Sequence, residues 1–275
     1  MNLRNLAGKA VGAALSPLTG AIALVRRARM FHPDGTVYRA SVAPLAAEGP
    51  LGALADRLQG EAIVRLSSAW WRGGKEWTDV LGLAVRFRGK AVALDAPPWP
   101  GDQDLLTATI RSPLTMALAP LTTLQHDYLA NDFYAVSPFK VDGLGRAKLR
   151  LRSLRHERHA PDPGDEGRGR AERLARAVAA GRAVFHLEAR LLPPANSLNG
   201  LVASAVAGSS LDRDGTWVPV AKMSLEAQLP VDQAALRFDP FLNGRGMVPT
   251  GFVHALRRAT YTSSQLARPA TATAK

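Results

Sequence analysis

Strict alternation of apolar and polar residues is the feature of this sequence that most constrains its fold. Large apolar side chains recur at every second position in four segments, residues 80–88, 146–152, 184–191 and 217–229. Because the side chains of a β-strand point to opposite faces in turn, this period predicts half-buried antiparallel strands. Two further strands are predicted at Thr36–Val42 and Ala62–Ser67.

Helical periodicity occurs in fewer segments, which are Leu51–Leu58, Leu114–Leu129, Arg170–Arg182 and Val253–Leu266. Six or more strands with helices between and after them predict an α+β protein built on an antiparallel sheet. A sheet of that size usually curls or closes into a barrel. Segments 159–170 and 191–200, rich in proline, glycine or polar residues, are predicted loops.

The composition is that of a globular protein with a sizeable core. The chain has 275 residues, of which 47% are hydrophobic and 21% are charged, enough for one large domain or two small ones. It contains no cysteine, which excludes disulfides, thiolate catalysis, zinc fingers and iron–sulfur clusters. The net charge of +12 predicts an anionic partner, which is nucleic acid, an anionic membrane or an anionic ligand.

Residues 1–28 form an apolar and basic extension that is predicted to be helical. Its apolar run, Val11 to Val25, is interrupted by polar residues and a proline and is shorter than the ~20 residues that a membrane span needs. Basic residues follow directly and no good cleavage site is present, which disfavours a signal peptide. Two hypotheses are equally supported: a helix on an anionic membrane surface through residues 1–29, or a helix packed on the domain or on another subunit. We expect a cytoplasmic protein, peripheral at the membrane if the first hypothesis holds.

A stripe of polar side chains marks the C-terminal helix. At about 100° per residue, Tyr261 and Arg268 lie within about 40° of Arg257 around the helix. Arg257 is one turn from Tyr261, and a guanidinium at hydrogen-bond distance favours the phenolate form of tyrosine. A phenolate is an iron ligand, including in haem proteins. Taken alone, the stripe is better explained as the solvated face of a surface helix.

Two further polar clusters lie nearer the N-terminus. In "RARMFHPDG", Arg29 stands three residues before His32, beside a Pro-Asp-Gly turn and just before a predicted strand. Functional side chains are often found on such loops. In "VRLSSAWW", Arg65 and Ser67 lie on the same face of a predicted strand.

Taken in the order in which they occur along the chain, the three clusters resemble the haem-binding core of the catalase superfamily. That family has an arginine three residues before its distal histidine, then Arg-x-Ser on a strand, and finally Arg-x-x-x-Tyr with another arginine seven residues later. "VLGLAVRFRG", "QDLLTATIRSP" and "FDPFLNGRGMVPTG" stand where the family has a strand, a polar segment and the approach to its proximal helix. The resemblance is loose over residues 29–268 and close at the three clusters. The chain is similar to the minimal, short catalase-related haem proteins of bacteria.

The resemblance implies an antiparallel β-barrel of the catalase type with surrounding helices and a C-terminal haem-proximal helix. It implies one haem-binding domain over residues 29–268. Residues 269–275, the end of "ARPATATAK", are predicted to be a disordered tail. The cofactor would be haem b, with iron. The implied residue roles are as follows: Tyr261 is the axial iron ligand, Arg257 keeps it a phenolate, and Arg29, Arg65 and Arg268 pair with the propionates. His32 would move a proton between the peroxide oxygens as general base and then acid, and Ser67 would orient its imidazole.

The sequence departs from the family at the distal asparagine. No asparagine is present near residues 107–109, and Thr109 is the best aligned position, while Phe31 replaces a small aliphatic residue. Both changes widen the implied function from catalase to a haem peroxidase that cleaves hydrogen peroxide or organic hydroperoxides, with an unidentified electron donor. A hydroperoxide isomerase is equally compatible with these residues.

Two other classes of protein are compatible with the sequence. The first is a lipid- or membrane-binding barrel that has lost haem, supported by residues 1–29. The second is a nucleic-acid binder, supported by charge alone and ranked last. Aromatic residues make up only 6% of the chain and do not interleave with the basic ones as on a stacking platform. The sequence leaves open whether the protein is a homo-oligomer.

Overall fold

The structure is a computed structural model, which describes residues 34–46, 48–71, 74–89, 94, 96–154, 164–194, 202–203, 216–231 and 236–250. All six predicted strands are confirmed, each with ends within two residues of the prediction: β1 (Gly35–Pro44), β2 (Gly60–Ser68), β3 (Leu81–Gly89), β7 (Gly145–Ser153), β8 (Val184–Leu191) and β9 (Val218–Gln228). Four strands were not predicted: β4 (Gln103–Ala108), β5 (Asp132–Tyr134), β6 (Phe139–Val141) and β10 (Met247–Pro249). Three of these four have three residues each, too few to establish a period of two.

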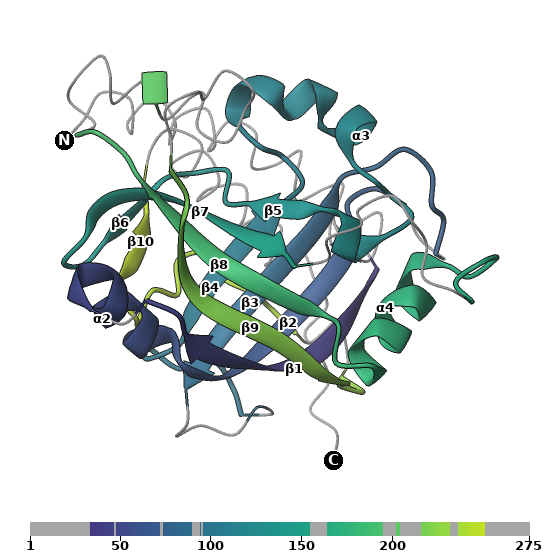
Figure 1. The fold of residues 1–275 in the computed structure, drawn as a ribbon, viewed down its shortest axis with the longest axis horizontal. Helices are drawn as coiled ribbons and strands as arrows, with labels where there is room; N and C mark the ends of the chain where they lie inside the picture. Colours follow the sequence, from purple (N-terminus) through teal and green to yellow (C-terminus); the bar gives the residue numbers. More distant parts are fainter. Residues whose placement is uncertain are drawn as a thin grey trace, which may run out of the picture.

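Eight of the strands close into an antiparallel barrel (Figure 1). They follow the order β7-β5-β4-β3-β2-β1-β9-β8, and β8 pairs with β7 to complete the ring. Closure leaves these strands without free sheet edges, which is the usual reason for a sheet of this size to become a barrel. The predicted barrel is therefore confirmed. β6 and β10 extend the sheet beyond the ring, because β6 pairs with the first residues of β7.

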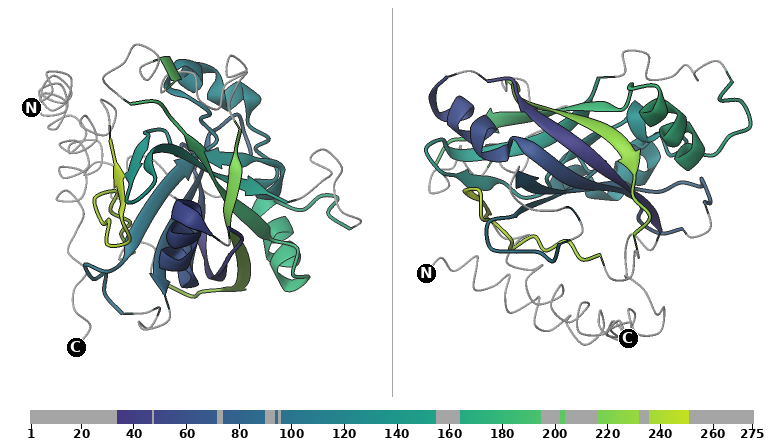
Figure 2. Two further views of the ribbon diagram at one scale, coloured as in Figure 1. Left: turned by 60° about the vertical axis from the view of Figure 1, so that its left-hand side comes forward. Right: turned by 90° about the horizontal axis from the view of Figure 1, so that it is seen from below.

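The described helices are short and lie around the barrel. α2 (Gly49–Leu58) is confirmed, and α4 (Arg170–Ala179) ends three residues before the prediction, ahead of Gly181 with φ of 66°. Figure 2 shows α2 near one end of the barrel and α4 near the other. No helix among the described residues is long and apolar enough to cross a membrane.

The single helix predicted at Leu114–Leu129 is wrong. The segment forms a 3-10 helix, η1 (Pro113–Leu118), a short α3 (Ala119–Thr122), a turn, and a second 3-10 helix, η2 (Tyr128–Ala130). A proline stands in the first turn of η1 and another in that of α3. Because proline has no N–H to donate, Pro120 cannot continue the hydrogen-bond ladder of the preceding turn. The predicted helix Val253–Leu266, the extension 1–28 and the tail 269–275 lie outside the described residues.

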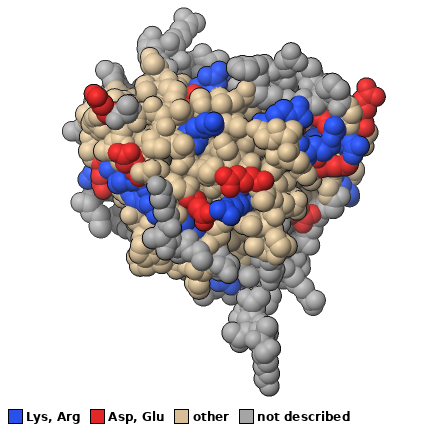
Figure 3. Space-filling view, turned by 60° about the horizontal axis from the view of Figure 1, so that its bottom comes forward, with Lys and Arg blue, Asp and Glu red and all other residues tan. Residues whose placement is uncertain are grey.

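Basic and acidic side chains are interspersed on the described surface. On the face shown in Figure 3, blue and red residues stand next to each other among residues of neither kind. Among the described residues, Arg39, on the exposed side of β1, lies between Glu61 and Glu226. The surplus positive charge of the chain is thus not concentrated on the described part of this face.

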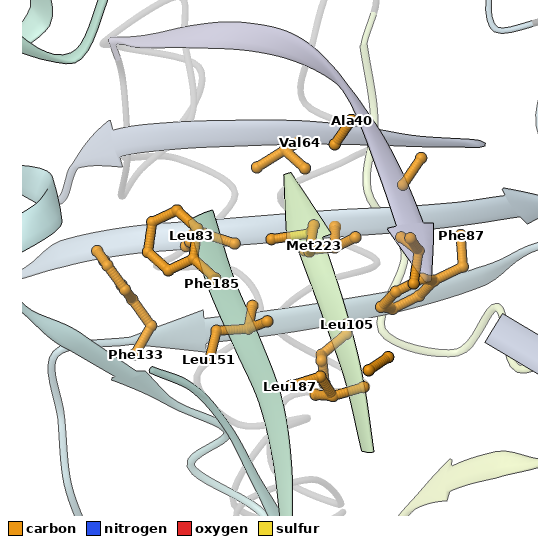
Figure 4. Packing of buried hydrophobic residues seen from close by; sticks show 14 of the residues in the cluster. Ala40, Val64, Leu83, Phe87, Leu105, Phe133, Leu151, Phe185, Leu187 and Met223 are labelled. Atoms are coloured by element: carbon orange, nitrogen blue, oxygen red, sulfur yellow. The ribbon is translucent and has the colours of Figure 1, made fainter. Parts of the chain in front are cut away.

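The barrel interior is an apolar core (Figure 4). Leu83 and Phe87 of β3, Leu105 of β4, Phe185 of β8 and Met223 of β9 point into it, and none is more than 1% exposed. All of these residues except Leu105 of the unpredicted β4 belong to the apolar positions of the alternating segments, so the inward face of the predicted strands was predicted correctly. The expectation that the other face meets solvent is wrong for β2 and β3. Nearly all residues of both strands are buried, because other chain segments cover the outside of the barrel there.

Candidate functional site

A row of small residues crosses the outer face of the barrel where β2 ends. Its members are paired neighbours on four consecutive strands, from β1 to β4: Gly35, Ser67, Gly82 and Ala108. Paired residues share a face, and the residues that flank the row, such as Leu66 and Leu83, point into the core. At about 4.8 Å between strands, the row extends over about 14 Å. It forms a strip that carries no side chain larger than a hydroxymethyl group.

Arg65 lies beside this row. It precedes Ser67 by two residues on β2 and shares its outer face, and Arg65 and Ser67 are 4% and 3% exposed. The Arg65 guanidinium reaches toward β1, because a Cβ placed on Gly35 would lie 2.9 Å from Arg65 Cζ. Glycine at position 35 thus leaves the room that the guanidinium fills. The predicted propionate-binding arginine and the predicted imidazole-orienting serine are brought together on one buried face.

Thr109 has its hydroxyl engaged within the chain. Its Oγ1 accepts a hydrogen bond from the Leu81 N–H at 3.1 Å and lies 2.7 Å from Thr123 Oγ1. Thr123 Oγ1 lies 2.8 Å from the Ala119 carbonyl oxygen, to which it donates. The proton between the two threonines therefore comes from Thr109, and this chain of bonds ties α3 to the ends of β3 and β4. A donor role of Thr109 toward a peroxide would require that bond to be broken.

Five predicted site residues lie outside the described residues: Arg29, His32, Arg257, Tyr261 and Arg268. The structure therefore relates Arg65, Ser67 and Thr109 to each other but not to these five. Thr109 directly follows Ala108, the last member of the small-residue row, so it stands at the β4 end of the row.

Two buried ion pairs link β3 and β4 on the same outer face. Arg86 donates to both oxygens of Asp104, at 2.8 and 2.7 Å. Arg88 contacts Asp102 at 2.9 Å. None of the four side chains is more than 3% exposed. A buried charge costs several kcal/mol unless it is paired, so each arginine requires its carboxylate.

These ion pairs also hold the segments that cover the outer face. Arg88 donates to backbone carbonyls in residues 94–97, and Asp104 accepts from the Asp239 N–H at 2.7 Å. Gln103 adds bonds to residues 242–247, three of which are at 3.1–3.2 Å. The right-hand view of Figure 2 shows this segment, drawn in yellow, running along the outside of the barrel. Residues 236–250, which lead to the predicted proximal helix, are thereby fixed to β3 and β4.

A small cavity lies next to Asp104. It measures about 10 Å³ and is lined by Asp104, Ser137 and their neighbours in residues 135–139, with Pro240 and Pro249 on the other side. The buried Ser137 hydroxyl has no hydrogen-bond partner among the described residues. Burial raises the pKa of Asp104 to about 6, although its bonds to Arg86 favour the charged form. The cavity has room for one water molecule and not for an organic ligand.

On another side of the barrel, β7 carries a lysine that is 0% exposed. The Lys148 ammonium donates to the Val136 carbonyl at 3.0 Å, and within the described residues no carboxylate faces it. Its neighbour across the ladder is Arg190 of β8. Burial lowers the pKa of Lys148 to about 7.

The sequence predictions did not include the two ion pairs or Lys148. The sequence contains a pattern that could have predicted the ion pairs, because Arg86 and Arg88 have the same spacing as Asp102 and Asp104. It contains no pattern that could have predicted the burial of Lys148, because the polar positions at 146–152 are all basic.

No protein-family model matches the chain, and no curated protein matches its sequence. The resemblance to the catalase superfamily therefore rests on the order and spacing of the three clusters. The barrel itself is established by the strand pairing.

Proposed function

We propose that this chain is a haem-dependent peroxidase or catalase-related oxidoreductase that cleaves hydrogen peroxide or organic hydroperoxides. The haem b would bind against the outer face of β1–β4. The observation that carries the proposal is the row of small residues with buried Arg65 beside it. A flat strip next to a buried guanidinium is a suitable surface for a planar ligand that carries carboxylates.

The described residues fit a haem in two respects. The macrocycle is flat and apolar, and the middle of the row, Ser67 and Gly82, carries no bulky side chain of its own, while the Arg65 guanidinium lies over Gly35 at one end and Ala108 packs with Ala119 of α3 at the other. The propionates are carboxylates, which an arginine binds with two parallel hydrogen bonds, and Arg65 stands at the edge of the row. Arg29 and Arg268 would supply the other contacts to the propionates, and Tyr261, kept as phenolate by Arg257, would ligate the iron.

The covalent chain keeps the proposed distal histidine close to Ser67. His32 is three residues before Gly35, so their Cα atoms are at most about 11 Å apart in any conformation. Gly35 is paired with Ser67. The covalent chain therefore permits an imidazole at position 32 to reach the Ser67 hydroxyl, which would orient it by bonding one ring nitrogen.

The chemistry proposed for the chain itself is proton transfer. His32 would accept the proton of one peroxide oxygen and return it to the other, so that water or an alcohol leaves. Haem, when bound, supplies the iron that takes part in O–O bond cleavage. Because the Thr109 hydroxyl is bonded to Thr123, we assign Thr109 to holding the end of β4 in place. Without a distal asparagine, a hydroperoxide isomerase remains the second candidate within the same site.

An optical spectrum of protein expressed with ample haem tests the proposal. We expect a strong Soret band in the wild-type chain and its loss or marked shift in Tyr261→Phe. Arg65→Leu should weaken haem binding about tenfold or more, the value of one lost charge-assisted contact. Arg39→Leu is the matched control, because Arg39 is an exposed arginine on β1 paired with Glu61. A colourless wild-type protein would contradict the proposal.

A further inference from the structure

A segment without charged residues is exposed where β2 ends and β3 begins. Between Arg111 and Asp127 there is no Asp, Glu, Lys or Arg, and η1, α3 and the following turn occupy this stretch. Its exposed aliphatic side chains are Met116, Leu118, Leu121 and Leu124, at 42%, 58%, 75% and 36%. Exposed apolar side chains that gather in one place mark an interaction site more often than scattered ones do.

α3 directs these side chains away from the barrel. Ala119 is buried in a small cluster with Ala69 and Val80, which fixes the inward face of the helix. Leu121 lies about 200° from Ala119 around the helix and only about 60° from Leu118 when counted back one turn. Both leucines therefore point outward. Figure 1 shows η1 and α3 on the outside of the barrel, standing clear of the strands.

Two tryptophans of the β2–β3 loop stand at the same end. Trp70 and Trp77 are 41% and 57% exposed. Trp70 directly follows Ala69, which packs with Ala119 of α3. The Trp77 and Trp71 rings form a T-shaped pair, with ring centroids 4.9 Å apart. Tryptophan is enriched where apolar and aqueous phases meet, because its ring is apolar and its N–H is polar. We call the six residues Trp70, Trp77, Met116, Leu118, Leu121 and Leu124 the apolar tip.

Basic side chains without a carboxylate partner border the apolar tip. Three nearby carboxylates are engaged within the protein, in the pairs Glu76–His126, Asp165–Arg176 and Glu172–Arg168, while Glu166 is exposed and forms no ion pair among the described residues. Lys75, Arg111 and Arg173 have no carboxylate partner among the described residues. The Lys75 ammonium lies 4.7 Å from the centre of the Trp77 ring, and Arg173 donates to the His126 carbonyl at 2.8 Å.

We propose that the apolar tip docks on the surface of an anionic lipid bilayer. Leu118 and Leu121 would enter the acyl boundary, and Trp77 with Lys75 would lie among the headgroups. A bilayer fits better than a protein groove, because the apolar side chains stand on a protruding helix and unpaired cations border them. This surface is separate from residues 1–29 and does not depend on haem binding.

The cysteine-free sequence allows a direct test. Leu121→Cys in the full chain gives one thiol, which is labelled with an environment-sensitive fluorophore and mixed with phosphatidylcholine vesicles with or without phosphatidylserine. We expect the emission to shift to the blue and gain intensity on the anionic vesicles. Val248→Cys is the matched control: it is 39% exposed on β10, away from the apolar tip, and its label should not respond.

The label separates the apolar tip from other attachments. A chain that sediments with vesicles while the label at position 121 stays unchanged is bound through another segment, and this result overturns the proposal. A blue shift that grows with protein concentration without lipid shows self-association through the tip and also overturns it. Leu118→Ser/Leu121→Ser should weaken vesicle binding about tenfold or more, since two exposed leucines lose their apolar contact. As both residues are exposed, the thermal unfolding of this variant should match the wild type.

Discussion

The inside of the barrel is apolar, whereas the outer face of β2–β4, which is also largely buried, combines apolar side chains such as Ile63 with buried arginines and aspartates. Inside, Leu83, Phe87 and Phe185 pack against each other with no polar partner to satisfy. Outside, Arg65 and Arg86 are no more than 4% exposed and depend on specific partners and space. An apolar core alone is enough to close the barrel. The buried arginines outside are not needed for closure: Arg88 holds a covering segment of the chain, and Arg65 lies beside the row of small residues, where we propose that the ligand binds.

Buried basic side chains on the outside of the barrel are stabilised in two different ways. On the outer face of β3, Arg86 is neutralised by Asp104 of β4, and Arg88 by Asp102, the residue directly before β4. On β7, Lys148 is held by one carbonyl, and its burial makes the neutral amine accessible near neutral pH. Burial shifts the pKa in both arrangements, to about 6 for Asp104 and to about 7 for Lys148, and the Lys148 shift predicts a stability that rises with pH above neutrality.

The largest effect should come from the interior. Phe185→Ala removes a ring that is 0% exposed and meets the Phe133 ring edge-on, with centroids 6.1 Å apart. We expect the free energy of unfolding to fall by about 4 kcal/mol in urea titrations. Leu191→Ala, at a 58% exposed position of the same strand, should change it by less than about 1 kcal/mol. Equal losses in the two variants would mean that the interior is not the packed core described above.

Breaking an outer ion pair should cost slightly less. Arg86→Met leaves the Asp104 carboxylate buried without its guanidinium, and we expect a loss of about 3 kcal/mol. Because the penalty comes from the unpaired charge, Arg86→Met/Asp104→Leu should recover most of it. The same urea titrations measure both variants. A double variant as unstable as the single one would show that the pair is required for more than charge balance.

Lys148→Met should stabilise the protein at low pH. Burial lowers the pKa of Lys148 from 10.5 to about 7 in the folded state, so between these values the unfolded chain binds more protons. Stability of the wild type therefore rises with pH over that window. We expect Lys148→Met to be more stable by about 2 kcal/mol near pH 6 and nearly equal near pH 10. A difference that does not change with pH would refute the assignment.

The smallest effect concerns Thr109. Thr109→Val removes the hydroxyl between Leu81 and Thr123, and we expect a loss of about 1–2 kcal/mol in stability. If Thr109 only positions β4, kcat and KM of the folded, haem-loaded variant should stay near wild type. Thr122→Val is the control, because Thr122 is exposed and its hydroxyl donates to the Ala119 carbonyl within α3. A drop in kcat alone would restore Thr109 to a catalytic role.

The barrel could be predicted because its long strands alternate over many residues, and period two fixes which face turns inward. The short strands β5, β6 and β10 could not, because three residues carry no period. The outer face was predicted to be solvated because the sequence shows polarity and not what covers it. Arg65 and Ser67 were predicted on one face from their spacing. That Gly35 and Gly82 lie next to Ser67 could not be predicted, because they are 32 and 15 residues away from it in the chain and only the strand register brings them together.

The most direct measurement of the central claim is a titration of the purified wild-type chain and Arg65→Leu with haem, followed by the Soret absorbance. If the outer face of β1–β4 holds the haem, the wild type should show a saturable band, and Arg65→Leu should need about tenfold more haem. Arg39→Leu should titrate like the wild type. No saturable band in the wild type, or one that is unchanged by Arg65→Leu, would contradict a haem site on this face.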